Sequence, residues 1–212
     1  MRIVIAMLIV IFLSAPVSAG IVTRHVATDA EMLYYIQNIA VVAEGRIGDR
    51  GGAATFELDL GDNTGNPATT AQYNWQSAVA EPFTFSYNNV TNVATFTLGG
   101  RTLSYSPVIS FKEFFVRTRA VDASTGVQVY DLVLNGQSVG DVSSATGPDD
   151  LDILAVSGVD LYQGFTLTGV AVLTWGATPP TQSRLAFQIK VGNAPSVPAE
   201  QTSWGRIKGL YQ

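Results

Sequence analysis

The chain has one histidine and no cysteine, so few of its residues suit nucleophilic or metal-based chemistry. His25 precedes the first segment with a clear secondary-structure pattern, and we expect it on a loosely ordered surface terminus. The sequence contains no GxSxG, HExxH or Walker-type motif, which hydrolases, zinc peptidases and nucleotide-binding enzymes carry. Without cysteine, thiol catalysis and cysteine-ligated zinc are excluded. We therefore expect a protein that is not an enzyme, with no cofactor and no metal site.

Glu57 and Asp59 form the best pair of carboxylates for acid–base chemistry. In residues 55–60 apolar side chains alternate with the two acids, so a strand would hold both acids on its outer face, about 7 Å apart. Inverting glycosidases use a similar separation. Acidic residues are also common on the solvent-facing side of strands, and we favour that interpretation over catalysis.

Two segments rich in Asp and Asn carry oxygen atoms of the kind that bind calcium. They are residues 61–66 and residues 147–152. Calcium takes roughly six to eight oxygen ligands, and neither segment supplies that number or has the EF-hand spacing. Asp and Asn are also ordinary turn residues, because their side chains bond to the local backbone. We interpret both segments as turns.

Tyr73 and Trp75 are the candidate ligand-binding residues. On a strand they would share one face, with Gln72, Asn74 and Gln76 alternating between them. Aromatic planes flanked by amides provide the apolar stacking and directed hydrogen bonds that sugar binding requires. The alternative is that the two rings belong to the core, and that alternative is favoured.

Period-two alternation of apolar residues predicts a series of short strands separated by Gly, Asn and Asp turns. Asn135-Gly136 is the strongest hairpin signal, and Gly99-Gly100 can close a second hairpin. The fold class is therefore all-β, a two-layer antiparallel β-sandwich that is jelly-roll-like. The predicted strands are residues 40–47, 54–60, 83–87, 94–98, 102–105, 114–121, 127–134, 137–139, 153–156, 165–175 and 184–191.

One short N-terminal helix is also expected. Thr28 followed by Glu31 forms a capping box, and Met32, Tyr35, Ile36 and Ile39 then follow at helical spacing. A strand is the alternative, because Tyr and Ile also favour extended structure.

The ends of the chain suggest export. Residues 1–19 have a basic start, an apolar run and a small-residue cleavage site, which together indicate a signal peptide. Residues 20–192 would form the sandwich domain, and the proline-bearing residues 193–199 a linker. Residues 200–212 would form a tail in which Trp204, Ile207 and Leu210 recur at intervals of three, as in a sorting or partner-binding segment. The alternative is that the tail covers a sheet edge of its own domain.

Charge and hydropathy limit the partners. The formal net charge is −5 and the basic residues do not cluster along the sequence, which argues against nucleic acid. After the first 19 residues no apolar run is long enough to span a membrane.

Several stretches resemble the choice-of-anchor family of bacterial surface domains, chiefly residues 44–48, 54–58, 82–87, 94–100 and 164–169. The resemblance implies a β-rich exported domain without a cofactor or known catalytic residues. This chain departs from the common pattern in having neither an apolar C-terminal helix with a basic tail nor a Leu-Pro sortase motif.

Three functional hypotheses follow. The first is a non-enzymatic extracellular protein of a bacterial envelope or matrix, secreted or at the cell surface, which acts by surface contact. The second is a glycan-binding module or carbohydrate-active enzyme on the same scaffold. The third is a self-assembling subunit that uses strand addition to like subunits.

Overall fold

The computed structural model describes residues 20–36, 38–48, 56–64, 67–107, 111 and 113–193. The predicted signal peptide and the predicted tail residues Trp204, Ile207 and Leu210 lie outside the described residues. Within this part of the chain the protein is a two-layer antiparallel β-sandwich, as predicted. None of the helices in these residues has the length and apolar character needed to cross a membrane.

The described residues form one helix and fourteen strands. In chain order these are β1 (Val22–Val26), α1 (Asp29–Tyr35), β2 (Asn38–Arg46), β3 (Leu58–Gly61), β4 (Thr69–Ala71), β5 (Ala80–Asn88), β6 (Val93–Leu98), β7 (Arg101–Tyr105), β8 (Glu113–Ala120), β9 (Gly126–Leu134), β10 (Gln137–Ser138), β11 (Ser143–Thr146), β12 (Asp150–Ser157), β13 (Phe165–Thr174) and β14 (Leu185–Asn193).

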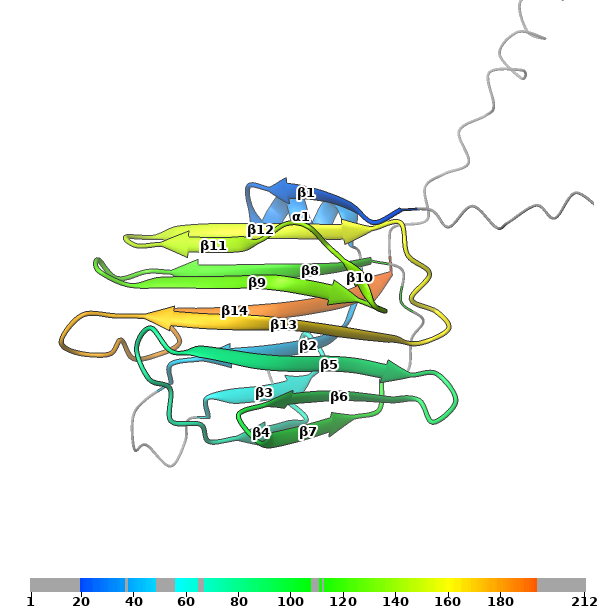
Figure 1. The fold of residues 1–212 in the computed structure, drawn as a ribbon, viewed down its shortest axis with the longest axis horizontal. Coiled ribbons are helices and arrows are strands. Elements are labelled where there is room, and N and C mark those ends of the chain that lie inside the picture. The colour runs from blue at the N-terminus through cyan, green and yellow to red at the C-terminus, as the bar shows by residue number, and fades with distance from the viewer. Residues whose placement is uncertain are drawn as a thin grey trace, which may run out of the picture.

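The strands divide into two sheets whose strands run along the long axis of the molecule (Figure 1). Sheet A has the order β1-β12-β8-β14-β2-β3-β4. Sheet B has the order β10-β9-β13-β5-β6-β7, and β11 also pairs with β9. From β7 onward the chain passes repeatedly from one sheet to the other, a crossing pattern like that of jelly rolls.

The period-two pattern identified the long strands correctly. Both predicted hairpin turns are also present, with positive φ angles at Asn135 and Gly136 and at Gly99 and Gly100. The strands that the pattern missed are β1, β4 and β11, which are five residues or shorter and rich in polar residues. Their place in the sheets comes from pairing with longer neighbours and not from their own hydropathy.

The main core lies between the sheets. It includes Phe96, Leu132 and Phe187, which the period-two pattern places on the inward faces of their strands and which are at most 2% exposed. Alternation sends the other side chains of the same strands outward. In β14, for example, Phe187 and Ile189 are buried in this core while Gln188 and Lys190 lie on the outer face of sheet A.

Helix α1 packs on the outer face of sheet A. Thr28 caps it, with its Oγ1 accepting a hydrogen bond from the backbone N–H of Glu31 at 3.1 Å. Met32 and Ile36 then enter a second, smaller apolar cluster with Phe115 and Ile153. Helix α1 thus covers the part of sheet A formed by β1, β12 and β8, and lies beside β1 in Figure 1.

Candidate functional site

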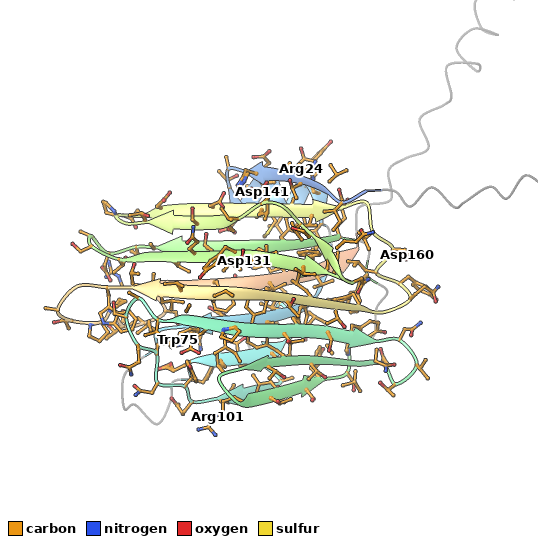
Figure 2. The ribbon with its side chains drawn as sticks, in the orientation of Figure 1. Arg24, Trp75, Arg101, Asp131, Asp141 and Asp160 are labelled. Atoms are coloured by element: carbon orange, nitrogen blue, oxygen red, sulfur yellow. The ribbon has the colours of Figure 1, made fainter. Side chains whose placement is uncertain are left out.

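Tyr73 and Trp75 directly follow β4 in the chain. Trp75 is 3% exposed and belongs to the main core, where its ring lies edge to face against Phe187 with the centroids 6.2 Å apart. Tyr73 contacts Trp75 in the same manner at 4.9 Å. Figure 2 shows Trp75 within the stack of strands, whereas Arg101 extends from its edge.

Glycine residues make room for both rings. A Cβ atom on Gly99, where φ is +55°, would collide with the Tyr73 ring, and one on Gly45 would meet the rings of Phe187 and Trp75. Burial and a hydrogen bond to Glu81 raise the pKa of Tyr73 to about 12. Tyr73 and Trp75 therefore join the two sheets, and the buried faces of Trp75 offer no platform on which a sugar could stack.

A pocket of about 290 Å³ lies beside these rings. Glu57 and Trp175 also line it. Among the described residues, the buried Nε1 of Trp75 is recorded without a hydrogen-bond partner. Glu57 accepts a hydrogen bond from the backbone N–H of Gly48 at 3.2 Å. That Tyr73 and Trp75 bind a ligand stays a prediction. Such a ligand would contact the two residues only where they line this pocket.

The structure separates Glu57 from Asp59. Glu57 lines the pocket beside Trp75, whereas Asp59 lines a groove on the outer face of sheet A. Strand β3 begins only at Leu58, so the alternation expected for residues 54–60 does not extend to Glu57. Both acids are buried, at 6% and 7% exposure. The prediction of a shared, solvated strand face is therefore wrong.

Asp59 is paired instead with Glu44. The antiparallel register of β2 and β3 places these two residues directly opposite each other. Opposed carboxylates repel, and burial adds a desolvation cost to their charge. Burial and the charge of Glu44 raise the pKa of Asp59 to about 8, while the positive charge of Arg46 opposes this increase. At neutral pH the pair therefore holds one proton and one negative charge.

The groove that contains this pair has a volume of about 530 Å³. Its floor is a row of side chains across four strands, in which Arg117, Gln188, Glu44 and Asp59 are successive cross-strand neighbours. Lys190 lies two residues along β14 from Gln188 and shares its face.

Two walls flank this floor, one formed by α1 and the other by Arg46 and Phe56. On one side Asp29 of α1 accepts two hydrogen bonds from the guanidinium of Arg117, at 2.7 and 2.8 Å, and Leu33 stands above them. On the other side Arg46 donates a hydrogen bond to the carbonyl of Phe56 at 3.1 Å, and its guanidinium lies 3.9 Å from the centre of the Phe56 ring. These contacts hold both walls to the sheet.

Alternation in sequence marks Glu44, Arg117, Gln188 and Lys190 as outward-facing positions of their strands. Nothing in the sequence indicates that their strands are neighbours, since β2, β8 and β14 are separated by long stretches of chain. The grouping of these residues was therefore missed.

His25 lies in strand β1 and is not part of a loose terminus. Its Nδ1 is 2.6 Å from a carboxylate oxygen of Asp152, and its Nε2 is 3.3 Å from one of Asp141. These contacts raise its pKa, with the Asp152 hydrogen bond as the largest cause. The surface position was correctly predicted, since the side chain is 49% exposed.

The two Asp-rich segments form turns only in part: residues 62–64 follow β3 and residues 147–149 precede β12, whereas residues 150–152 belong to β12 itself. The Asp62 carboxylate accepts a hydrogen bond from the backbone N–H of Thr64, and that of Asp150 accepts one from Thr146. No cluster of three or more His, Asp or Glu side chains suited to a metal ion occurs among the described residues.

No protein-family model matches the sequence, and no curated protein matches it at a significant level.

Proposed function

We propose that this chain is a non-enzymatic extracellular module of a bacterial envelope or matrix, and that it acts by surface contact through the groove of sheet A. The ligand we propose is a polysaccharide. The observation that carries the proposal is the groove itself, because about 530 Å³ is within the size range of small-ligand sites. Extracellular location rests on the signal-peptide pattern of residues 1–19 and the choice-of-anchor resemblance.

The chemistry of the groove supports a sugar ligand. Gln188 at its centre offers amide donor and acceptor groups, and Ser183 at its rim offers a hydroxyl. Phe56 and Leu33 supply apolar surface on opposite walls, suited to the C–H faces of sugar rings. Recognition here depends on side chains, because the main chain of β14 is already paired on both sides.

The arrangement of the acids supports binding rather than hydrolysis. Asp59 is in hydrogen-bonding contact with Glu44. Retaining glycosidases hold their two carboxyl groups about 5–5.5 Å apart and inverting enzymes hold them further apart, so that a sugar or a water fits between them. Carboxyl groups in direct contact leave no such space.

A glycan array followed by titration calorimetry tests the proposal. We expect Gln188→Ala to lower the affinity for a bound glycan about tenfold, the effect of losing one or two hydrogen bonds. Gln128→Ala is the matched control, because Gln128 is an exposed strand residue of sheet B. Equal affinity of the two variants, or product formation from the bound glycan, would contradict the proposal.

A further inference from the structure

The groove collects positive charge in a protein that is acidic overall. The formal net charge of the chain is −5. Four of the seven cationic side chains that the structure describes nevertheless line this one groove. The four are Arg46, Arg117, Arg119 and Lys190, and the other three are Arg24, Arg101 and Arg184.

The pairing register of β8, β14 and β2 places these four cations on one face of sheet A. Lys190 lies opposite Phe115, which is two residues before Arg117 on β8, so Lys190 and Arg117 are diagonal neighbours on one face. Arg119 lies two residues further along β8. Ala186 separates Arg119 from Arg46 across the sheet, and its small side chain leaves the space between them open.

The acidic residues of the groove are already engaged by other groups. Asp29 is bound by Arg117 through two hydrogen bonds, and this contact lowers the pKa of Asp29. Asp59 is protonated at neutral pH, because its pKa is about 8. The groove holds four cationic and four acidic side chains, and the raised pKa of Asp59 shifts this balance toward positive charge.

Lys190 is a partly buried cation without an ion pair in the described residues. It is half-buried, and burial together with the neighbouring Arg117 lowers its pKa, although the charges of Asp29 and Glu44 oppose this decrease. In the described part of the chain no acidic oxygen is recorded within 4.0 Å of its ammonium group, and the same holds for the guanidinium of Arg119. An anion in the groove would compensate both charges.

We propose that the ligand of this groove is an acidic polysaccharide whose uronate carboxylates bind at Lys190 and Arg119. The inference rests on the proposed function and specifies its ligand class. A guanidinium binds a carboxylate through two parallel hydrogen bonds, and an ammonium binds it as a point charge. An acidic peptide fits less well, because extended peptides gain affinity by pairing with a free strand edge and the floor of this groove has none.

The test compares charged and neutral forms of the same sugars. Galacturonate, mannuronate and guluronate hexasaccharides and their methyl esters are titrated into the protein by calorimetry. We expect at least one free acid to bind about tenfold or more tightly than its ester, and its affinity to decrease with added salt. Lys190→Gln should remove most of this preference. Arg101→Gln, which changes a cation outside the groove, should leave it intact.

Each result separates this inference from the proposed function. If the esters bind as well as the acids and Gln188→Ala still weakens binding, the groove binds glycans but not through charge, and only this inference fails. If no saccharide binds, both fail. Tighter binding of polyglutamate or of sulfated oligosaccharides than of every uronate would also overturn the inference. Circular dichroism of Lys190→Gln should show an unchanged β spectrum, so that lost affinity reflects the ligand contact.

Discussion

At the scale of the residue, the raised pKa of Asp59 beside Glu44 makes the free energy of unfolding depend on pH. The pKa of Asp59 is 3.8 in an unfolded chain and about 8 in the folded protein. Between these values the native state keeps a proton that the unfolded state has lost, so the contribution of Asp59 to the free energy of unfolding decreases as pH rises through this window.

We therefore expect Asp59→Asn to gain stability relative to the wild type as pH rises from 5 to 9, because the amide imitates the neutral carboxyl and cannot ionise. Thermal unfolding at both pH values measures this gain, at roughly 2–4 °C in Tm for each kcal/mol. Asp62→Asn is the control, since hydrogen bonds from Thr64 lower the pKa of Asp62 and keep it ionised throughout. A difference between Asp59→Asn and wild type that does not change with pH would show that Asp59 is charged in the folded protein.

At the scale of the element, α1 is a short helix that depends on its contacts with sheet A. Seven residues are too few for a stable isolated helix in water. Burial of Met32 and Ile36 and the ion pair between Asp29 and Arg117 hold it on the sheet. The same contacts position the wall of the groove that carries Leu33.

Two adjacent substitutions test how α1 is oriented. Met32→Ala should lower the free energy of unfolding by about 2–5 kcal/mol, because Met32 is 1% exposed and its removal leaves a cavity. Leu33→Ala should cost less than about 1 kcal/mol, because Leu33 is 50% exposed. Urea denaturation measures both values. Similar costs for the two variants would mean that the helix is rotated or detached.

For the whole molecule, stability comes from the single large core between the sheets, since the chain contains no cysteine to form disulfides. Leu132 on β9 is 2% exposed in this core and lies against Gly169 of β13. We expect Leu132→Ala to cost about 2–5 kcal/mol in urea denaturation. Val90→Ala, in an exposed turn where Val90 is 89% accessible, should change stability by less than about 0.5 kcal/mol. Equal costs would place Leu132 outside the core.

Local patterns in the sequence were sufficient for much of the fold. Alternation is a property of extended backbone, so it identified the long strands and assigned Phe187 to the core. Turn residues that tolerate positive φ marked the hairpin at Asn135 and Gly136, and the capping box at Thr28 marked the start of α1. Each of these signals depends on only a few neighbouring residues, which is why it is readable without the fold.

Only the tertiary structure decided which strands are neighbours. Strand pairing is set by the joint burial of all inner faces, and no local pattern records it. Asp59 therefore lies opposite Glu44 and apart from Glu57. Trp75 lies in the core, which is the alternative that the sequence favoured for it. The groove exists because β8, β14, β2 and β3 lie side by side, so Lys190 and Arg117, far apart in the sequence, share one face of sheet A.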